Sequence, residues 1–382
     1  MTRVRLDTFD GRLRAAGLRL ELRQADDLEL ILAGRGAVRA QLPVTEPPRL
    51  AADLPAGPFR ARLAPIVDGR ALLPLVTAAS RETLAIRRDA TGAAVVTATV
   101  HEGVDVVDGR GLPGWTIEVD ELAGYPKSAR RVRDLLDGLG LRRLDGDTLD
   151  VAAVATGAAT AGCARSPTVA LDRDAPALAG YQAVLANLTE GMAANWQGTV
   201  DDVDPDFLHD LRVAVRRIRS VLAQGKRVLP AEPRRRFGEG FRWLGHITGR
   251  ARDLDVYVIE WDRYVAPLPA DVAAALGPVL DHLGGARPAA HASLAAELEG
   301  SRSRRLLAEW RVWLSDPSGG GSPGSEASRA LHEVVADRIA RAQRRVLDAG
   351  RAIGDDTPVE HLHELRKDAK RLRYLLECFG GS

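Results

Sequence analysis

Two stretches of the chain repeat one pattern of apolar and cationic residues. The first reads FLHDLRVAVRRIRSVLA and begins at Phe207, and the second reads LHELRKDAKRLRYLLE and begins at Leu362. At a constant offset of 154 residues (363 minus 209), histidine matches histidine, cation matches cation and acid matches acid. The apolar positions coincide too, with Leu208, Leu211, Ile218 and Leu222 over Leu362, Leu365, Leu372 and Leu376. A repeat of this kind predicts two similar helical halves, arranged about a pseudo-twofold axis.

Each stretch has the periodicity of an amphipathic helix with two adjacent faces. One face holds the matched apolar residues and is expected to enter a core. The neighbouring strip holds a histidine and three cations: His209, Arg212, Arg216 and Arg219 in the first stretch, and His363, Arg366, Lys370 and Arg373 in the second. Like charges three or four residues apart repel each other by about 0.2–0.5 kcal/mol per pair. Because the chain carries this cost twice, we expect the two strips to face each other across a cleft that holds an anion.

A solvated face is the alternative interpretation of such a strip, with acids of other helices neutralising its charge. It is the better interpretation for one arginine-rich helix, but two matched helices favour an anion site. The histidines can be caps or buried hydrogen-bonding groups. Beside three cations an imidazole stays neutral more readily, and it can then accept from an arginine or donate to a phosphate oxygen.

The segment between the two stretches continues the basic theme. We interpret the cluster RRR at 234–236 as a solvated helix start. Asp253 and Asp255 could form a metal-binding pair with Arg252 beside them, but acids in such a place more often orient arginines or cap a helix.

The net charge of the chain is only +1, with 53 Lys and Arg against 52 Asp and Glu, so a polyanion site requires an uneven distribution of charge. The 382 residues allow two domains, and 45% apolar with 27% charged residues are typical of a soluble globular protein. Cys163 and Cys378 form neither a disulfide framework nor a metal-ligand set. The N-terminus lacks the apolar core of a signal peptide, and no apolar stretch approaches about 20 residues. We therefore expect a cytoplasmic protein without a membrane partner.

The pattern of the chain changes near residue 148. Up to that point, short alternating or β-branched segments lie at 18–22, 28–33, 83–88, 94–100 and 115–122. Turn residues separate them, including Asp-Gly pairs at 68–69 and 108–109. They predict an α+β domain at 1–148 with a mostly antiparallel sheet and one helix at 127–139. Residues 149–175 are small and weakly periodic, and are expected to be a linker.

Helical periodicity dominates from residue 176 to 382 and predicts an all-α bundle. We expect helices at 178–196, 206–229, 233–250, 252–263, 270–283, 288–314, 326–350 and 358–379. Asp206 and Pro358 stand where helix starts are expected. The low-complexity segment 315–328 is expected to be a flexible connection between two long helices.

The paired motifs HDLRVAVRRIR and HELRKDAKRLRY, with GRARDLDV between them, resemble the CHAD family, the conserved-histidine α-helical domain. The resemblance covers about 176–382. It implies a helical bundle of two halves with a basic central channel that binds inorganic polyphosphate. Carried over by position, the ligand-facing residues would be His209, Arg212, Arg216, Arg219, His363, Arg366, Lys370 and Arg373, with Arg217, Arg252, Lys367 and Arg371 on the flanks.

The chain departs from this family's pattern at its end. Family members follow the second histidine helix with a helix pair that mirrors 241–262, whereas this sequence ends at Ser382. Either the sequence is a fragment or its second half is short.

The first 148 residues resemble a degenerate CYTH, or triphosphate-tunnel, domain. The similar parts are LDTFDGRLRAAGLRLELR at 6–23, SRETLAIRRD at 80–89 and EVDEL at 118–122. The family's opening Glu-x-Glu-x-Lys strand, which supplies metal-binding acids and a catalytic lysine, is missing. Glu118 and Asp120 are the candidates for a late acidic pair that binds Mg²⁺. The alternative is that they are strand residues paired with Arg23, Arg81 or Arg87.

Three functions follow from these features. The first is binding of polyphosphate or a similar polyanion without covalent chemistry, with no cofactor and with location in the cytoplasm at polyphosphate granules. The second is metal-dependent hydrolysis of triphosphate or polyphosphate by a closed barrel in the N-terminal half. The third is docking of an acidic protein or a nucleic acid. Few aromatics are interleaved with the cations, which argues against single-stranded nucleic acid, and no pattern indicates sequence-specific reading of bases.

Overall fold

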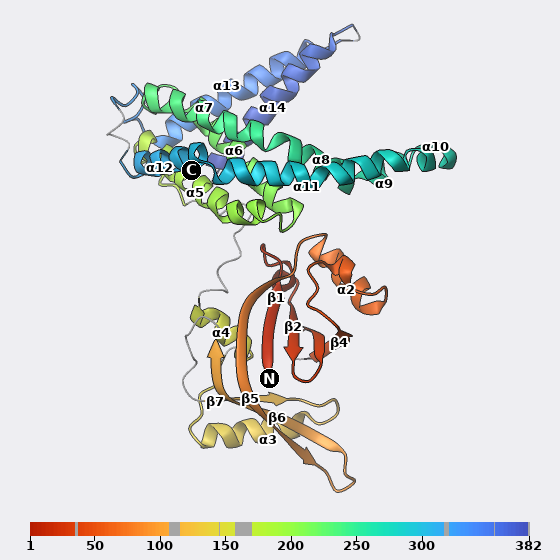
Figure 1. Cartoon of the computed structure of the whole chain (residues 1–382). Coiled ribbons are helices and arrows are strands. Elements are labelled where there is room, and N and C mark those ends of the chain that lie inside the picture. Colours follow the sequence, from red (N-terminus) through yellow and green to blue (C-terminus); the bar gives the residue numbers. More distant parts are fainter. Residues whose placement is uncertain are drawn as a thin grey trace. The chain divides into compact units, whose positions relative to one another are not determined.

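Two units, each with its own hydrophobic core, make up the chain (Figure 1). The computed structural model describes residues 1–34, 37–106, 115–144, 146–156, 170–316, 321–354 and 356–380. The first unit spans Met1–Ala164 and the second Arg165–Ser382. No helix in these described ranges is both long enough and apolar enough to cross a membrane.

The first unit is built on a seven-stranded antiparallel sheet, as the sequence predicts. Its strand order is β4-β3-β2-β1-β5-β6-β7, and neighbouring strands are antiparallel throughout this order. The strands are β1 (Thr2–Asp7), β2 (Leu18–Gln24), β3 (Leu28–Gly34), β4 (Ala37–Val44), β5 (Leu73–Arg88), β6 (Ala94–Val106) and β7 (Trp115–Asp120). Around the sheet lie α1 (Arg12–Ala15), the 3-10 turn η1 (Ala51–Asp53), α2 (Pro58–Val67), α3 (Pro126–Gly138) and α4 (Thr148–Thr156).

Strict alternation in the strands gives this sheet one apolar and one charged face. In β2 the leucines of LRLELRQ point to a core shared with α1 and α2, where Leu20 and Leu63 are fully buried. The other face carries Arg19, Glu21 and Arg23 from the same strand. The charged face is therefore a second interior, and its charges must be paired there.

The segment LDTFDG forms a turn rather than a ligand site. The carboxylate of Asp7 accepts hydrogen bonds from the backbone amides of Thr8, Leu13 and Arg14, which caps α1. The predicted turn at 68–69 is present, since Asp68 and Gly69 both have positive φ after α2. The pair at 108–109 lies outside the described residues.

Residues 148–156 are helical, so the linker expected from residue 149 does not begin there. In α4, Leu149, Ala152 and Ala153 are buried against Val76 and Ala78 of β5. These small side chains let the helix lie close to the sheet, and their low periodicity hid the helix in the sequence. Residues 157–169 of the expected linker lie outside the described residues, its last part at 170–175 contains neither helix nor strand, and the first unit extends to Ala164 instead of 148.

The second unit is all helical, as predicted. Its helices are α5 (Ala177–Val200), α6 (Pro205–Gln224), α7 (Ala231–Ile247), α8 (Gly249–Ile259), α9 (Trp261–Val265), α10 (Ala270–Ala275), α11 (Gly277–Glu299), α12 (Ser301–Ser315), α13 (Leu331–Arg351) and α14 (Val359–Phe379). The expected helix at 206–229 ends earlier, at Gln224, and those at 270–283 and 288–314 divide at Leu276 and Gly300. Burial of Cys378 raises the pKa of its thiol to about 11.

One helix cap and one connection differ from the prediction, and one helix start agrees with it. The cap of α6 is Asp204, whose carboxylate accepts from the amides of Asp206 and Phe207, so Asp206 lies in the first turn. Pro358 does stand at the start of α14. The second half of the 315–328 connection is anchored, because the amides of Gly324 and Glu326 donate to the carbonyls of Val228 and Arg227.

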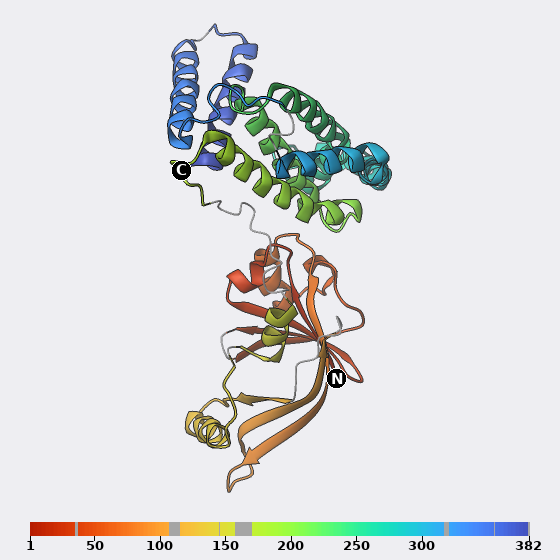
Figure 2. The ribbon, with the colours of Figure 1, turned by 90° about the vertical axis from the view of Figure 1, so that its left-hand side faces the viewer.

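The two repeated helices each pack against the long helix that precedes them. α6 lies along α5 and α14 along α13, and α6 also contacts α14. Figure 2 shows α13 and α14 side by side as a helical hairpin. The repeat is therefore present as two helix pairs, α5 with α6 and α13 with α14, that meet along α6 and α14.

Candidate anion-binding cleft

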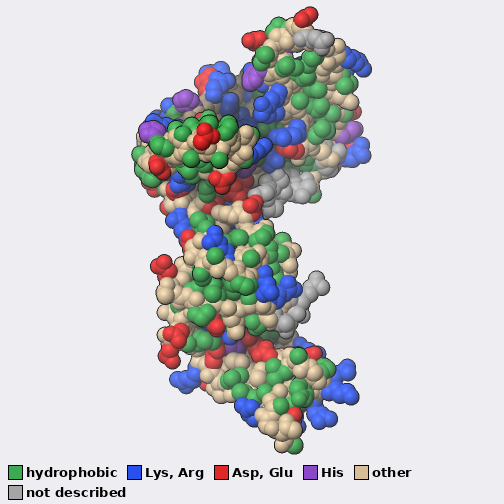
Figure 3. Space-filling model, turned by 90° about the vertical axis from the view of Figure 1, so that its right-hand side faces the viewer, with side chains coloured by type: hydrophobic (Ala, Val, Ile, Leu, Met, Phe, Trp, Pro, Cys, Tyr) green, Lys and Arg blue, Asp and Glu red, His purple; other side chains and the backbone are tan. Residues whose placement is uncertain are grey.

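A cleft of about 1010 Å³ lies between α6, α7 and α14. Its volume is at the upper end of the roughly 300–1,000 Å³ typical of ligand pockets. Figure 3 shows Lys and Arg side chains gathered where the surface of the helical unit is hollowed. The charged residues that line the cleft are Arg216, Arg219, Arg234, Arg235, Arg242, Lys367, Lys370 and Arg371, with Glu232 and Glu239.

An aromatic core positions α7 as one wall of this cleft. Phe237 and Phe241 are fully buried on one side of the helix and pack edge-on against the fully buried Trp310 of α12. The other side of α7 then carries Arg234, Gly238 and Arg242 at four-residue spacing, which places them on one face. Packing of α7 thus fixes the direction in which its arginines point.

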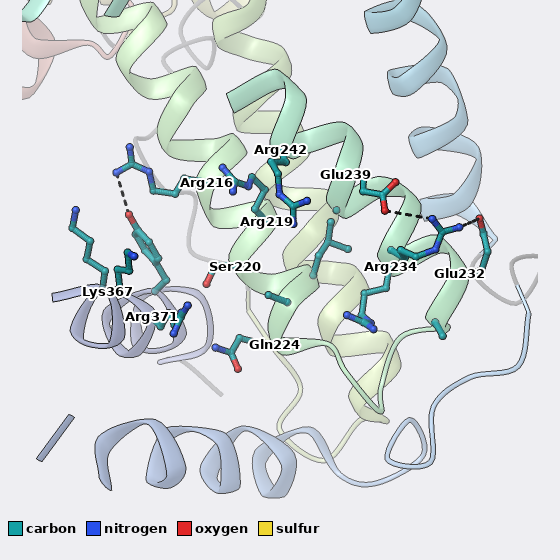
Figure 4. Close-up of a pocket in the computed structure, with 17 residues that line it drawn as sticks. Arg216, Arg219, Ser220, Gln224, Glu232, Arg234, Glu239, Arg242, Lys367 and Arg371 are labelled. Carbon is teal, nitrogen blue, oxygen red and sulfur yellow. Dashed lines mark hydrogen bonds and ion pairs between the residues drawn. The ribbon is translucent and has the colours of Figure 1, made fainter. Parts of the chain in front are cut away.

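A tyrosine and an ion pair join α6 to α14 at the opposite wall. Arg216 Nη1 lies 3.5 Å from the hydroxyl of Tyr374, as Figure 4 shows. Arg217 Nη2 donates to the carboxylate of Glu377 at 2.9 Å. The ring of Phe379 packs on that of Tyr181 of α5, at 4.8 Å between centroids. These contacts hold the end of α14 on the core, so its cations stay beside α6.

Most of the cations around the cleft have no acidic partner. Within the described residues, no ion pair with a carboxylate involves Arg216, Arg219, Arg234, Arg242 or Lys370. The remaining three are paired: Arg235 with Glu232 and Glu239, Lys367 with Glu364, and Arg371 with Asp368. Eight cations against two lining acids leave the cleft with a formal charge of +6 (8 minus 2).

The unpaired guanidinium groups lie close enough to act on each other. Figure 4 shows Arg219 of α6 and Arg242 of α7 directed toward the same space. Partial burial and the neighbouring charges of Arg242 and Arg216 lower the pKa of Arg219 from its ordinary value. A lowered arginine pKa means that the charged form is destabilised where it stands. The arginine still carries its charge at neutral pH, and a bound anion would remove that destabilisation.

Five of the cations predicted for the cleft or its flanks line it, two from α6 and three from α14. Arg216, Arg219 and Lys370, from the predicted strips, line the cleft, and so do Lys367 and Arg371, which were expected on the flank. The face of α14 that lines the cleft is therefore rotated about the helix axis, from the predicted strip toward the flank that holds Lys367 and Arg371. Arg217 and Arg371 occupy matched positions, yet Arg217 pairs with Glu377, so the repeat does not produce equivalent surfaces.

The other predicted residues do not line the cleft. Arg212 is half-buried and its Nη1 donates to the carbonyl of Gly245 at 3.1 Å and to Thr248 Oγ1 at 2.6 Å. It holds α6 to the junction of α7 and α8. Arg252 Nη1 lies 3.5 Å from the carbonyl of Pro205.

A further group of predicted residues lies outside the cleft. His209, His363, Arg366 and Arg373 are exposed and are not among its lining residues. Arg373 pairs with Glu377 and lies over the ring of Tyr374. The histidines that define the repeated motif thus lie beside the cleft rather than in it.

The arginines of 234–236 do stand in the first turns of α7, and Arg235 and Arg236 are exposed as expected, but two of the three arginines also line the cleft. Arg234 and Arg235 line the cleft together with Arg242, whereas Arg236 stacks on the ring of Phe237 and pairs with Glu309. The four-residue spacing of Arg234, Gly238 and Arg242, opposite Phe237 and Phe241, was the sequence signal for this wall.

The acid of the GRARDLDV segment does orient an arginine. Asp255 is fully buried and accepts from Arg287 Nε at 2.7 Å, and it lies 2.9 Å from His291 Nε2. Arg287 also binds Asp202 through two nitrogens. This network connects α8 to α11 and to the turn before α6. No group of metal-ligating side chains suited to an ion occurs among the described residues.

The charged face of the sheet unit contains a second cluster, and it includes Glu118. Arg3 donates to Glu21 at 2.7 Å and to Glu118 at 3.1 Å. His101 lies 3.2 Å from Glu82 and 3.5 Å from Glu118, and the amide of Thr148 donates to Glu118. Glu118 is thus held by Arg3, His101 and the start of α4, and not by Arg23, Arg81 or Arg87 as expected. Asp120 is exposed and accepts from Thr97 Oγ1.

This cluster is neutralised internally, in contrast to the cleft. Its cations are Arg3, Arg5, Arg19, Arg23 and His101, and its acids are Glu21, Glu82, Glu118, Asp147 and Asp150. Burial opposes the charge on His101, but hydrogen bonds to Glu118 and Glu82 outweigh it and raise the pKa to about 9. Burial also opposes the charge on Glu118, but His101 and Arg3 hold its pKa well below the usual range. A fully paired set of this kind offers neither free carboxylates to a metal nor free cations to an anion.

A family model of the CHAD domain matches residues 183–382, which is more than half of the chain and includes all three walls of the cleft. The chain belongs to the CHAD family. The cleft is thus a feature of the CHAD part of the chain, and the sheet unit lies outside the matched residues.

Relatives of this CHAD protein occur among curated proteins and solved structures. Uncharacterized proteins from two strains of Mycobacterium tuberculosis are each 29% identical over 189 residues. That alignment covers 48% of this chain and 36% of each relative, so the chain spans about a third of the length of the curated relatives it matches.

Two solved structures are similar to the chain. The CHAD domain of the plant Ricinus communis is 27% identical with a TM-score of 0.48, covering 57% of this chain and 70% of its own. PptA from Streptomyces chartreusis is 18% identical with a TM-score of 0.42, covering 54% and 76%.

Proposed function

We propose that the helical unit of this CHAD protein binds inorganic polyphosphate, or a similar polyanion, in the cleft between α6, α7 and α14, without covalent chemistry. One observation carries the proposal: five cations from three helices converge on the cleft, and none of them has an acidic partner in the described part of the chain. Partial burial and the charges of Arg242 and Arg216 destabilise the charged form of Arg219, and an anion bound beside it relieves that destabilisation.

The chemistry of the lining favours a phosphate chain over nucleic acid. Forked guanidinium groups bind phosphate oxygens in pairs, and a chain with about one charge per phosphate needs a row of them. Stacking on aromatic rings contributes roughly 1–3 kcal/mol per base in single-stranded nucleic acid binding. Tyr374 is the single aromatic among the described residues that line the cleft, and its ring is buried.

Hydrolysis by the sheet unit is not part of the proposal. The hydrolase alternative requires a closed barrel with convergent free carboxylates. The described strands form an open order that ends at β4 and β7, and Glu118 is already held by Arg3, His101 and Thr148. The strand expected to carry Glu-x-Glu-x-Lys carries Arg3 and Arg5 here, both paired to acids.

Titration with ligands of matched charge tests the proposal. We expect polyphosphate of defined length to bind the full chain more tightly than single-stranded DNA or ATP at equal concentrations of phosphate groups. Equal competition by DNA would instead favour the docking of nucleic acids, and preferential capture of an acidic peptide would favour a protein partner.

A double variant tests the location of the site. Replacing Arg219→Gln and Arg242→Gln removes two unpaired cations, each worth roughly fivefold in affinity at ~0.1 M salt, so polyphosphate affinity should fall about 25-fold. The matched control is Arg263→Gln with Arg351→Gln, which removes the same charge from exposed positions outside the cleft. A similar loss in both double variants would place the binding elsewhere.

The proposal extends to where the protein acts. A binder of long phosphate chains should be found on polyphosphate granules in the cytoplasm. Fluorescence microscopy of the tagged chain checks this, and the Arg219→Gln, Arg242→Gln variant should be diffuse.

A further inference from the structure

A second, smaller hollow lies next to the cleft, between α13, α14 and the end of α6. Its volume is about 110 Å³, and it is lined by Gln224, Arg338, Arg341, Ala342, Arg345, Asp368 and Arg371. Gln224 and Arg371 also line the cleft, so the two spaces meet at these side chains. We call the smaller one the α13 hollow.

The positive charge of the α13 hollow is only partly compensated. Arg338 is committed to the fold, because it binds Glu326 at 2.8 Å and the carbonyls of Gln224 and Lys226. Asp368 binds Arg371 at 2.7 Å, while Arg345 is 3.8 Å away. Arg341 has no carboxylate partner among the described residues. The hollow therefore has three guanidinium groups besides Arg338 and one carboxylate, which is bound by Arg371 and near Arg345.

Packing alone does not require these arginines. α5 occupies the corresponding place beside α6 and contains no Lys or Arg over its 24 residues. α13 carries five arginines over 21 residues. Arg338, Arg341, Ala342 and Arg345 stand at three- and four-residue spacing, so one face of α13 is directed to the hollow. α13, which packs beside α14, thus has a cationic face at the edge of the cleft, whereas α5, which packs beside α6, has no cationic face.

We propose that Arg341 and Arg345 of α13, together with Arg371, form a second anion subsite that receives the continuation of a phosphate chain bound in the cleft. The inference rests on the proposed function and adds a dependence on chain length to it. The α13 hollow is smaller than the roughly 300 Å³ at which ligand pockets begin, so by itself it holds only a small anion. Its junction with the cleft at Gln224 and Arg371 makes it an extension of the longer site. Short chains fill the cleft alone, and long chains reach both spaces.

Two ligand lengths and two double variants test the subsite. Tripolyphosphate should bind the full-length wild type and the Arg341→Gln, Arg345→Gln variant with the same affinity. Polyphosphate several tens of phosphates long should bind that variant about 25-fold more weakly than the wild type at ~0.1 M salt, because two phosphate contacts are lost. The matched control, Arg344→Gln with Arg351→Gln, removes two exposed charges from the same helix outside the hollow and should bind both ligands like the wild type.

The outcomes separate the subsite from the proposed function. If the wild type binds neither tripolyphosphate nor the long-chain polyphosphate, the proposed function is refuted. Binding of both lengths by the wild type, with no length-specific loss in the Arg341→Gln, Arg345→Gln variant, would overturn the subsite alone. An equal loss of long-chain affinity in the Arg344→Gln, Arg351→Gln control would also overturn it, since the effect would then come from general charge. Arg341 and Arg345 are exposed, and unchanged circular dichroism verifies that the variant is folded.

Discussion

At the scale of single residues, pairing separates the two charged clusters of this protein. In the sheet unit Arg3, Glu118 and His101 satisfy one another in the interior. In the helical unit Arg219 and Arg242 approach each other with no acid between them. A cation that is already paired must give up its partner before it binds a ligand, whereas an unpaired one gains a partner. The unpaired cluster is therefore the one suited to anion binding.

The raised pKa of His101 makes the stability of the sheet unit depend on pH. Since its pKa is about 9 in the folded unit and about 6.5 in an unfolded chain, its contribution is fully present below about pH 6.5. It is lost as the pH rises through 9, and amounts to about 3 kcal/mol if the whole shift is realised. Hydrogen exchange of the β5, β6 and β7 amides should therefore accelerate between pH 6.5 and 9 beyond the intrinsic change.

His101→Gln should remove that pH dependence, while His246→Gln, an exposed histidine of the helical unit, should leave it. A pH profile that is the same in wild type and His101→Gln would show that another group causes it.

At the scale of elements, the same pattern of residues has two different surroundings. The apolar stripe of α6 is buried between α5 and α7, and Leu208 is 1% exposed. The matched stripe of α14 packs on α13 and α6 but is otherwise uncovered in the described structure, and Leu362 is 45% exposed. A similar pattern of residues thus produces similar helices, and their contributions to stability differ because burial differs.

Matched truncations measure this difference. Leu208→Ala removes a fully buried side chain and should lower the free energy of unfolding of the helical unit by about 2–5 kcal/mol. Leu362→Ala removes a half-exposed one and should cost less than about 1 kcal/mol. Urea titrations followed by far-UV circular dichroism compare the two. Equal costs would indicate that the exposed stripe of α14 is covered in solution.

At the scale of the whole molecule, positive and negative residues are nearly equal in number but unevenly distributed. The chain has a net charge of +1, yet the cleft alone carries +6 (eight cations minus two acids). Acids outside the cleft lining balance this charge in the total, among them Glu364 and Asp368, which pair with Lys367 and Arg371. A local positive field on a nearly neutral protein favours one polyanion site over general adhesion to polyanions.

Salt dependence measures how many cations the ligand engages. With about five phosphate contacts and a slope of about −0.7 per contact, the affinity for polyphosphate should fall about 100-fold between 50 and 200 mM salt. In the Arg219→Gln, Arg242→Gln variant, the slope of log affinity against log salt concentration should be shallower by about 1.4. A slope near zero would mean that the ligand is not held by its phosphates.

The sequence by itself determined the class of both units and the existence of the repeat, because alternation and helical periodicity are local properties. It indicated Arg216, Arg219 and Lys370, which do line the cleft, through their spacing on one helix face. It could not show that Phe237 and Phe241 would pack on Trp310 and so direct Arg234 and Arg242 into the same space. Nor could it show that Arg212 would be used to hold α7 and α8.

Only the tertiary structure decided which of the matched cations became a wall of the cleft. The rotation of each helix about its own axis is set by all the side chains that it buries, and those come from distant parts of the chain. Arg217 and Arg371 show the result: the same position in the repeat is bound to Glu377 in one helix and lines the cleft in the other.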